Sequence, residues 1–428
     1  MEVFEIEGGQ KLEGAVRIQG NKNEALPVLA ASLLSPEPVV LSNLPRISDV
    51  EDMVSLIRSV GATCEWVEDH TLKVVAADID ADRLDREAAK RIRASILLAG
   101  PLLARCGSAV LPPPGGDVIG RRRLDSHVRG LEALGAEFRH DEEGYHFDCS
   151  RLLGADHFMD EASVTASENI ICAAVLAHGT TILRHVACEP HVQGLCNMLN
   201  SMGARISGIG TNRLEIHGVP RLKGCTHEVG PDYLEIGSWI GLAMMTRSRF
   251  ELAPVVASDL RMIRLTFAKL GVQFTIEGET LHIDGSEGLE VRSELHNEIP
   301  RIDDGIWPAF PTDLMSIAIT MGTVATGTSL YFEKMFDGRM FFVDNLLAMG
   351  ASIIMCDPHR VVVTGPAELV GRSVESPDIR AGMALLIAAL AARGKSTIYN
   401  IRQIDRGYES IDEKLRAVGA KITRRALG

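Results

Sequence analysis

Residues 50–67 read VEDMVSLIRSVGATCEWV, which is a helical pattern, a glycine and a strand-like run in that order. The apolar residues of the first part recur every three or four positions, as is typical of a helix with one buried face. Gly61 then stands where the C-terminal end of a helix often needs a residue in the left-handed conformation. The run after the glycine indicates a strand. The stretch therefore predicts a helix that ends at a glycine and leads directly into a strand.

The same phrase occurs six times along the chain, at intervals of roughly 70 residues. In each copy a large apolar residue precedes the glycine, and Ala or Val follows it. The glycines are Gly61, Gly135, Gly203, Gly271, Gly350 and Gly419. We therefore expect six structural units of one kind.

A second phrase also recurs: an almost wholly apolar helical segment, a polar turn and a strand. Residues 170–186 (IICAAVLAHGTTILRHV) and 384–401 (ALLIAALAARGKSTIYNI) are examples. A helix that is apolar on all sides must be buried on all sides. Each unit thus supplies a buried helix, an amphipathic helix and strands.

Six such units fit two domains of three units better than one domain, because single cores stop growing at about 250–300 residues. Residues 218–235 (GVPRLKGCTHEVGPDYLE) are a plausible crossover between the halves. A linear solenoid of six units is the alternative that periodicity alone leaves open.

The composition is that of an ordinary globular protein, with 428 residues, 46% hydrophobic and 24% charged residues and a formal net charge of -13. This acidic balance disfavours a nucleic-acid-binding surface, which normally needs a basic face. The first residues lack the pattern of a signal peptide, and the chain has no uninterrupted apolar run of about eighteen residues. We expect a cytoplasmic protein that binds neither nucleic acid nor membranes.

The eight cysteines are scattered without a CxxC pair, so neither a disulfide framework nor a zinc ribbon is indicated. The tightest metal-like cluster, CEPHVQGLC at 188–196, offers three candidate ligands at a spacing that matches no common metal site. We expect these side chains to pack in the core and predict no metal site.

Polar residues gather instead where the units join. Lys22 and Asn23 precede the first helical run, where backbone N–H groups and a lysine can receive an anion. The alternative is a helix-capping Asn23 beside a solvated lysine. Asp313 stands at the start of an apolar helix, where an acidic residue is often structural.

Three arginines stand at similar junctions. Arg93 and Arg380 enter buried helical segments, and Arg406 follows a strand beside Asp405, where an ordinary ion pair is the alternative. Because the guanidinium fork matches phosphate and carboxylate, the set predicts a site for an anion with several negatively charged oxygens.

The chain resembles the enolpyruvyl transferases over essentially its whole length. The segments that carry the resemblance are GGQKLEGAVRIQGNKNEALPVLAA (8–31), RIRASILLAGPLLAR (91–105), PGGDVIGRRRLDSH (114–127), ASVTASEN (162–169), EPHVQGLCNMLNSMGA (189–204), PAFPTDLMS (308–316), DIRAG (378–382) and IDRGYESIDEKLRAVGA (404–420). The members that act on UDP-N-acetylglucosamine fit better than the shikimate-pathway members, whose GxKSxxxR-like and GNAGT-like signatures are absent.

The resemblance implies an α/β fold, the two-domain inside-out α/β barrel built from six βαβαββ-type repeats, and excludes the solenoid. It implies a first domain over 22–231 that carries the catalytic loop, and a second domain formed by 1–21 and 232–428, with the N-terminal strand crossing into the latter. It also implies phosphoenolpyruvate as donor, UDP-N-acetylglucosamine as acceptor, no metal or organic cofactor, and a place at the first committed step of peptidoglycan synthesis. A monomer is expected.

The resemblance also implies roles for individual residues. The residues expected to act in catalysis are Lys22, Asp117 and Asp313. Those expected to hold phosphoenolpyruvate are Lys22, Arg93, Arg122, Arg339, Arg380 and Arg406. Those expected to contact the UDP-sugar are Asn23, Arg93, Arg122, Arg123, Leu124, Asp125, Ser163, Val164, Thr165 and Asp313. Asp313 is the candidate base for the acceptor 3-hydroxyl, in an addition and elimination that pass through a tetrahedral ketal.

The loop acid departs from the usual family pattern. Asp117 stands where the family usually has the cysteine that protonates C3 of phosphoenolpyruvate and is the target of fosfomycin. A carboxyl group can transfer this proton if its pKa is raised, but it is a poorer nucleophile toward an epoxide than a thiolate. We expect Asp117 to keep the acid role and to make the enzyme insensitive to fosfomycin.

Two further departures concern the acceptor. Thr165 replaces a glycine near the diphosphate, and Arg123 replaces a proline beside the uracil. Since glycine permits a backbone approach that threonine can block, enolpyruvyl transfer to another uridine nucleotide or nucleoside is an alternative. A catalytically silent nucleotide-sugar-binding regulator is a third hypothesis, and it predicts that phosphoenolpyruvate contacts are lost. The contacts that remain are Lys22, Arg122, Asp313, Arg380 and Arg406.

Overall fold

The computed structural model describes residues 2–116, 120 and 123–427, and these form two compact units. The N-terminal unit comprises residues 20–116 and 123–230. The C-terminal unit comprises residues 2–19, 120 and 231–427. Each unit has a hydrophobic core of its own.

The N-terminal unit contains the strands β3 (Val39–Ser42), β4 (Thr63–Glu68), β5 (Thr71–Val75), β6 (Ser108–Leu111), β7 (Glu137–Asp141), β8 (Gly144–Asp148), β9 (Asp156–Phe158), β10 (Thr180–Arg184), β11 (Arg205–Ser207), β12 (Arg213–His217) and β13 (Cys225–Glu228). Its helices are α1 (Lys22–Ala31), α2 (Ser48–Ser59), α3 (Arg86–Ala89), α4 (Ala99–Cys106), α5 (Asp125–Ala133), α6 (Val164–Ala174) and α7 (Pro190–Ser201), with the short 3-10 helices η1 (Ser32–Leu34), η2 (Ala81–Arg83) and η3 (Arg93–Leu98). The strand orders of its sheets are β13-β3-β5-β4, β6-β8-β7 and β11-β12-β10-β9.

The C-terminal unit contains the strands β1 (Glu2–Glu7), β2 (Glu13–Arg17), β14 (Arg249–Ala253), β15 (Phe274–Glu277), β16 (Thr280–Asp284), β17 (Arg301–Asp303), β18 (Gly327–Phe332), β19 (Ser352–Asp357), β20 (Arg360–Gly365), β21 (Ser373–Glu375), β22 (Lys395–Tyr399) and β23 (Lys421–Ala426). Its helices are α8 (Tyr233–Thr246), α9 (Arg261–Ala268), α10 (Met315–Val324), α11 (Val343–Ala348), α12 (Ile379–Ala391), α13 (Arg402–Asp405) and α14 (Ile411–Ala417), with the 3-10 helices η4 (Ala257–Leu260), η5 (Leu295–Asn297) and η6 (Thr312–Leu314). The strand orders of its sheets are β15-β16-β14-β2, β17-β18-β20-β19 and β21-β22-β1-β23.

The repeat is clearest in the run β9, α6, β10, α7, β11, β12, which is a βαβαββ unit. Strand β9 pairs with β10 in parallel, and β12 pairs antiparallel with both β10 and β11. The run β17, α10, β18, α11, β19, β20 has the same order and the same pairing. The predicted repeat is therefore confirmed in its internal order.

All six repeat glycines adopt the left-handed region that the sequence predicted. Their φ angles are 108° at Gly61, 95° at Gly135, 100° at Gly203, 86° at Gly271, 103° at Gly350 and 99° at Gly419. Each glycine follows a helix and precedes a strand, which begins two residues after the glycine in five units and three residues after Gly271. An L-residue pays a steric penalty in this region, which is why glycine ends each of these helices.

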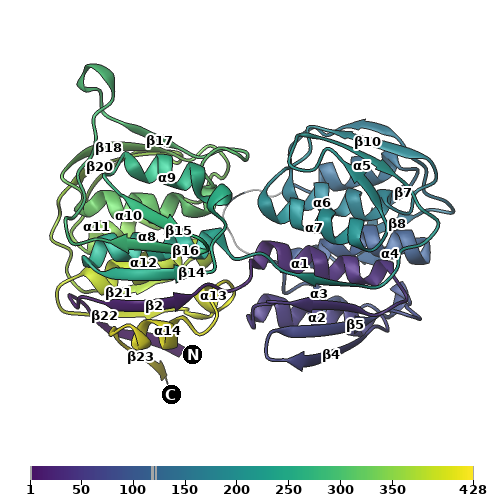
Figure 1. Cartoon of the computed structure of the whole chain (residues 1–428), viewed down its shortest axis with the longest axis horizontal. Helices are drawn as coiled ribbons and strands as arrows, with labels where there is room; N and C mark the ends of the chain where they lie inside the picture. The colour runs from purple at the N-terminus through teal and green to yellow at the C-terminus, as the bar shows by residue number, and fades with distance from the viewer. Residues whose placement is uncertain (1, 117–119, 121–122, 428) are drawn as a thin grey trace. The chain divides into compact units, whose positions relative to one another are not determined.

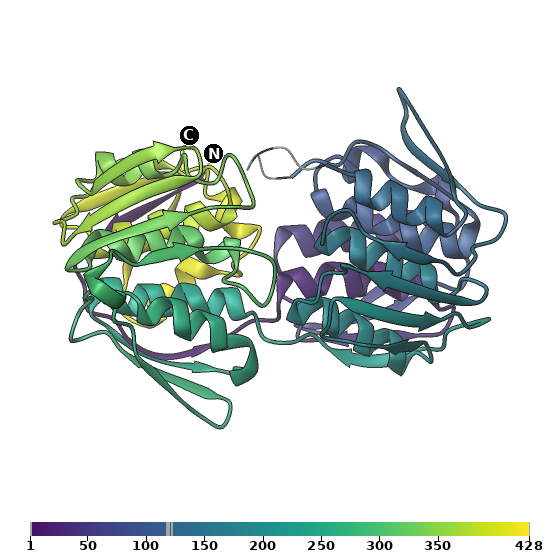
Figure 2. The ribbon, with the colours of Figure 1, turned by 90° about the horizontal axis from the view of Figure 1, so that it is seen from above.

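The apolar helices lie inside and the sheets outside. Every residue of α8 is buried, and α10 and α12 are buried along nearly their whole length. These three helices pack against one another in the C-terminal unit, and the views in Figures 1 and 2 show them running between the sheets. The helices α1, α4 and α6 have the corresponding positions in the N-terminal unit.

Two strands are exchanged between the halves of the chain. Strand β2 precedes α1 of the N-terminal unit but pairs in parallel with β14. Strand β13 precedes α8 of the C-terminal unit but pairs in parallel with β3. Strand β1 lies between β22 and β23 near the end of the chain. A linear solenoid would not place the first strand between two of the last, so the solenoid alternative is wrong.

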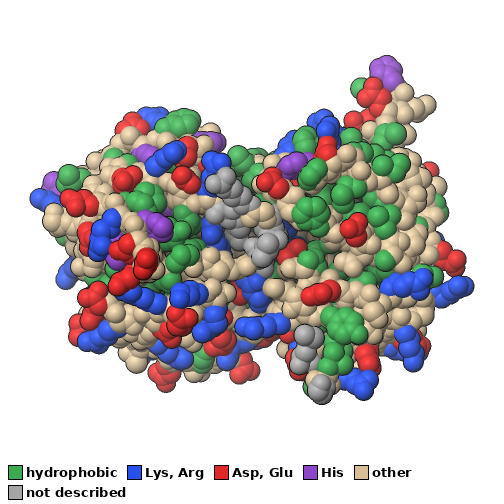
Figure 3. Space-filling model, turned by 180° about the vertical axis from the view of Figure 1, so that it is seen from behind, with side chains coloured by type: hydrophobic (Ala, Val, Ile, Leu, Met, Phe, Trp, Pro, Cys, Tyr) green, Lys and Arg blue, Asp and Glu red, His purple; other side chains and the backbone are tan. Residues whose placement is uncertain are grey.

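The surface carries charges of both signs. On the face in Figure 3, acidic and basic side chains are interspersed over each unit. Within the described part of the chain, no helix combines the length and the apolar character needed to cross a membrane.

Candidate active site

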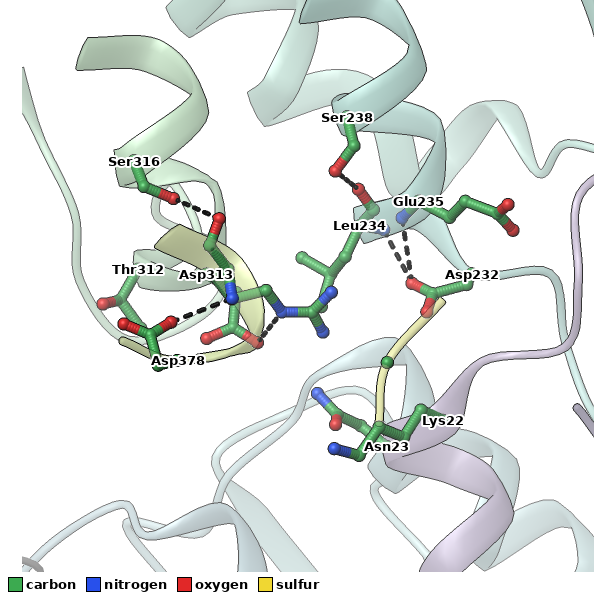
Figure 4. A network of polar contacts seen from close by, with 12 residues as sticks. Lys22, Asn23, Asp232, Leu234, Glu235, Ser238, Thr312, Asp313, Ser316 and Asp378 are labelled. Carbon is green, nitrogen blue, oxygen red and sulfur yellow. Dashed lines mark hydrogen bonds and ion pairs between the residues drawn. The ribbon is translucent and has the colours of Figure 1, made fainter. Parts of the chain in front are cut away.

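The Asp313 carboxylate lies between two buried guanidinium groups. Its Oδ1 accepts a hydrogen bond from Arg339 Nη2 at 3.0 Å, and its Oδ2 accepts one from Arg380 Nε at 3.1 Å. Asp313 lies in η6, directly before α10 (Figure 4). Arg380 is the second residue of α12. The structure thus brings together three residues that are far apart in the sequence and that the sequence assigned to one site.

A chain of hydrogen bonds through Tyr408 and Ser238 also holds Arg380 in place. Its Nη1 donates to the Tyr408 hydroxyl at 3.2 Å, and this hydroxyl lies 2.8 Å from Ser238 Oγ. Ser238 donates to the Leu234 carbonyl in the first turn of α8 (Figure 4), so the Tyr408 proton is directed to Ser238. Burial disfavours the charge of Arg380, but Tyr408 and the carboxylates of Asp313 and Asp232 outweigh it and raise the pKa of Arg380. Arg380 is therefore charged at any working pH.

Arg339 is supported by a second carboxyl group. Its Nε lies 3.7 Å from Glu333 Oε2, and its guanidinium stands over the Phe336 ring at 5.2 Å. Only 4% of Arg339 is exposed. Glu333 also accepts hydrogen bonds from Thr312, the neighbour of Asp313.

Arg406 follows α13 and donates from Nη1 to Gln403 Oε1 at 2.9 Å. The adjacent Asp405 carboxylate accepts two hydrogen bonds from Arg424, at 2.8 and 2.7 Å. Arg424 therefore supplies the cation that neutralises Asp405.

Lys22 is the first residue of α1 and is buried. Its Nζ lies 2.7 Å from Asp49 Oδ2 in the first turn of α2. The helix is capped by Asn21, whose side chain accepts from the N–H groups of Asn23 and Glu24. The capping role considered for Asn23 is therefore wrong, because α1 begins at Lys22 and Asn23 is already its second residue.

Arg93 is the first residue of η3, and its Nη2 lies 3.4 Å from the Arg123 carbonyl. Arg123 is exposed, Leu124 is the N-cap residue of α5, and Asp125 is its first residue. Arg123, Leu124 and Asp125 therefore stand at the start of one helix, and the Arg123 carbonyl contacts Arg93.

Ser163, Val164 and Thr165 form the start of α6, where Ser163 caps the helix by accepting from Ala166 N. The Thr165 hydroxyl lies 3.1 Å from His127 Nε2, and Asn169 Nδ2 donates to His127 Nδ1 at 3.0 Å. Burial, assisted by the charge of Arg93, lowers the pKa of His127 to about 3. His127 is therefore neutral with its proton on Nε2, and it donates to the threonine that replaces the family glycine.

The family model for EPSP synthase (3-phosphoshikimate 1-carboxyvinyltransferase) matches residues 6–415. The chain belongs to this family. Relatives named UDP-N-acetylglucosamine 1-carboxyvinyltransferase are 54% identical in Bradyrhizobium diazoefficiens (98% of this chain, 97% of the relative), 51% in Treponema denticola (99% and 99%) and 46% in Bacteroides thetaiotaomicron (99% and 100%).

Two solved structures share the fold of this family member. The enolpyruvyl transferase NikO from Streptomyces tendae matches with a TM-score of 0.89 and 24% identity, covering 100% of this chain and 99% of that chain. EPSP synthase from Acinetobacter baumannii matches with a TM-score of 0.73 and 18% identity, covering 100% of both chains. The predicted inside-out α/β barrel of the enolpyruvyl transferases is therefore confirmed.

Two expected site residues of this family member, Asp117 and Arg122, lie outside the described residues, so their roles stay predictions. Among the residues that are described, no group of three or more His, Cys, Asp or Glu side chains is arranged to hold a metal ion. All eight cysteines are free thiols.

Sequence reasoning missed the partners of the predicted residues. Asp49, His127, Glu333 and Tyr408 each contact a residue of the expected site, yet none stands at a characteristic spacing from it. His127 and Tyr408 do lie inside segments that carry the family resemblance, and this was the one available signal. Glu333 had no such signal.

Proposed function

We propose that this protein transfers the enolpyruvyl group of phosphoenolpyruvate to the 3-hydroxyl of UDP-N-acetylglucosamine and releases phosphate. The observation that carries the proposal is the Asp313 carboxylate held between the buried Arg339 and Arg380. The names of relatives at 45–54% identity over nearly the whole chain favour this acceptor over another uridine nucleotide. A silent regulator is disfavoured because the described arginines of the predicted site are intact.

The reaction would proceed in two steps. Asp313 takes the proton of the 3-hydroxyl while the oxygen bonds to C2 of phosphoenolpyruvate, and an acid, assigned to Asp117, protonates C3. The product is a tetrahedral ketal. A proton then leaves C3, the double bond forms again, and the C2–O bond to phosphate breaks. Cations that hold the phosphate and carboxylate stabilise the charge that develops on their oxygens.

The remaining roles are assigned from the predicted set. Arg339 and Arg380 hold phosphoenolpyruvate in the C-terminal unit, and Arg406 assists them. Lys22 and Arg93 of the N-terminal unit, and also Arg122, are assigned to hold phosphoenolpyruvate as well. The acceptor is assigned to Asn23, Arg123, Leu124, Asp125, Ser163, Val164 and Thr165. The two domains are assigned to residues 22–231 and to residues 1–21 together with 232–428.

The cellular assignment follows from the same proposal. The reaction is the first committed step of peptidoglycan synthesis, and no metal or organic cofactor takes part. A cytoplasmic monomer remains the prediction from the sequence.

Phosphate release from phosphoenolpyruvate tests the proposal. The purified protein is assayed with UDP-N-acetylglucosamine, with UMP and without acceptor, and the sugar product is identified by mass. We expect release only with UDP-N-acetylglucosamine. Release with UMP would favour the other acceptor class, whereas tight sugar-nucleotide binding without any release would favour the regulator.

A further inference from the structure

The residues that directly follow paired parallel strands have equivalent positions in the repeats. The pairs are β13 with β3, β9 with β10, β21 with β22, β17 with β18 and β2 with β14. In each pair the N–H of the residue after the first-named strand donates to the carbonyl of the last residue of the second-named strand. These bonds are Val229 N to Ser42 O at 3.0 Å, Met159 N to Arg184 O at 3.0 Å, Ser376 N to Tyr399 O at 3.1 Å, Asp304 N to Phe332 O at 3.4 Å and Ile18 N to Ala253 O at 2.7 Å. The five strand ends can therefore be compared directly. In the last of them the apolar Ile18 and Pro254 follow the two strands.

In three of these strand ends, a polar side chain of Asn or His closes the gap between the strands. Asn43, His185 and Asn400 follow the second strand, and their φ angles are 54°, 57° and 55°. Their side chains hydrogen-bond to the carbonyls after the first strand, at 2.8 Å for Val229, 2.9 Å for Met159 and 2.9 Å for Ser376. Three of the five parallel strand pairs therefore share this arrangement.

The strands β17 and β18 depart from this pattern. Asp303 pairs with Phe332 in their parallel register, so the next residues, Asp304 and Glu333, lie side by side. Both positions therefore carry a carboxyl group, and both side chains are buried, with 2% of Asp304 and none of Glu333 exposed. Two buried carboxylates at one strand end are costly unless a proton is shared between them.

The hydrogen bonds around the pair fit one shared proton. Glu333 accepts from Thr312 Oγ1 at 2.9 Å and from the N–H groups of Met335 and Phe336, both at 3.0 Å. Asp304 Oδ1 accepts from Lys334 N at 2.6 Å, whereas its buried Oδ2 has no donor among the described residues. A protonated Glu333 can supply a hydrogen bond to the Asp304 side chain. Burial, the hydrogen bond with Asp304 and the charge of Asp304 raise the pKa of Glu333 to about 8.

The pair contacts Arg339 and the residue that precedes Asp313. Glu333 holds Thr312, the residue before Asp313, and its Oε2 lies 3.7 Å from Arg339 Nε. This distance is too long for a hydrogen bond, and the buried Nε makes none. Arg339 instead donates from Nη2 to Asp313 at 3.0 Å.

We propose that Asp304 and Glu333 share one proton and that this proton keeps Arg339 directed at Asp313. The two are positioning residues that act through Arg339, and the proposal rests on the function proposed above. When the proton is lost, Glu333 becomes a full anion beside Arg339 Nε and competes with Asp313 for the guanidinium. Asp313 then loses one of its two cations.

The other charged groups near Glu333 do not replace this proton. Lys334 Nζ is directed to Asp303 Oδ2 at 2.6 Å. His359, in the turn between β19 and β20, contacts the Glu333 carbonyl at 2.8 Å through Nδ1 and Asp337 at 3.4 Å through Nε2. Among the described residues, Arg339 is the cation that lies beside the Glu333 carboxyl group, at 3.7 Å.

The pH profile of kcat for phosphate release tests the proposal with two variants. For the unaltered protein, kcat falls as the pH rises through about 8, because Glu333 then ionises. Glu333→Gln keeps a neutral acceptor and can donate to Asp304, so this alkaline fall disappears. At a pH one unit above the pKa, kcat of this variant exceeds that of the unaltered protein roughly tenfold. Asp304→Asn removes the neighbouring charge, so Glu333 ionises earlier and the fall begins at lower pH.

Asp303→Asn is the matched control, since it removes a carboxylate one residue away whose partners are Arg301 and Lys334. Its alkaline limb should coincide with that of the unaltered protein. A merely structural role would lower the melting temperature of the variants without moving their pH profiles in opposite directions. If one of the two variants fails to fold, the direction in which the alkaline limb of the other variant shifts still tests the shared proton.

An infrared measurement separates this proposal from the proposed function. Burial also raises the pKa of Glu168, so its protonated carboxyl group contributes to the infrared spectrum in all variants. At neutral pH the unaltered protein should show an additional band of a buried protonated carboxyl group, which Glu333→Gln and Asp304→Asn should both lose. Active protein with coincident profiles, or an unchanged band in both variants, would overturn the shared proton. Absence of phosphate release from all proteins, with the band behaving as expected, would instead reject the proposed substrate.

Discussion

Asp313 must be ionised before it can remove a proton, and its surroundings favour that state. Two guanidinium groups donate to it, and hydrogen bonds of this kind stabilise a carboxylate relative to its acid. The same guanidinium groups are suited to oxygens of phosphate and carboxylate. One cluster can therefore hold the donor substrate and keep the base in its working form.

Replacing Asp313 by Asn removes the base and places an amide N–H₂ group among guanidinium donors. We expect kcat for phosphate release to fall by about 10²- to 10⁴-fold, the usual contribution of a general base. The cooperative thermal transition of the variant checks that it is folded. A variant that keeps more than about a tenth of kcat would contradict the assignment of Asp313 as the base.

Asp117 determines the expected response to fosfomycin. A carboxylate is a weaker nucleophile toward an epoxide than a thiolate, so the unaltered protein should show no time-dependent loss of activity. Asp117→Cys should introduce covalent inactivation, measured as loss of activity with preincubation time and as an added mass on the intact protein. Asp117→Asn is the control and should lose the proton donor without gaining the adduct. Rapid inactivation of the unaltered protein would refute the role assigned to Asp117.

At the scale of the element, the glycines that end the amphipathic helices are not equivalent. Gly61 and Gly203 have similar φ angles, 108° and 100°. A Cβ on Gly203 would have no atom within 4 Å, whereas a Cβ on Gly61 would lie 2.7 Å from the Asp78 carbonyl oxygen. A side chain at Gly203 would therefore be penalised only by the backbone conformation. A side chain at Gly61 would be penalised by the conformation and by a clash with the backbone of Asp78.

We therefore expect Gly203→Ala to lower the free energy of unfolding by about 1–2 kcal/mol, the cost of the left-handed conformation. Gly61→Ala should cost more, because the Asp78 backbone must also move. Urea unfolding of both variants measures the difference. Equal losses would show that the clash is relieved without cost.

The elements also show where prediction from sequence succeeds. The six glycines and the buried helices follow from local patterns, because helix ends and apolar faces depend on neighbouring residues. The partners of β2 and β13 lie more than 180 residues away, and no local pattern specifies them. The same limit applies at the site. Asp313 and Arg380 stand in segments that carry the family resemblance, and the resemblance implied Arg339. Asp304 and Glu333 lie side by side only because of the register of β17 and β18, which no local pattern specifies.

At the scale of the whole molecule, the first strand is an internal part of the C-terminal unit. Strand β1 pairs on one edge with β22 and on the other with β23. Its side chains Val3, Phe4 and Ile6 are at most 2% exposed. Each contributes roughly 1.5–3 kcal/mol by burial, and a domain is stable by only about 5–15 kcal/mol. The C-terminal unit therefore depends on residues that precede the N-terminal unit in the chain.

This dependence predicts the outcome of a circular permutation. Glu2 pairs with Ala426, so the two ends of the chain lie close together and a short Gly/Ser linker can join them (Figure 1). A protein that begins at Gly20, continues to the C-terminus and then carries the linker and residues 2–19 keeps every strand in its sheet. We expect its thermal transition and its phosphate release to match those of the unaltered protein.

The deletion that begins at Gly8 is the control: it lacks β1 and should lose the cooperative transition of the C-terminal unit. If the deletion variant folds and the permuted protein does not, the C-terminal unit requires the natural order of the chain. In that case it does not require β1 between β22 and β23.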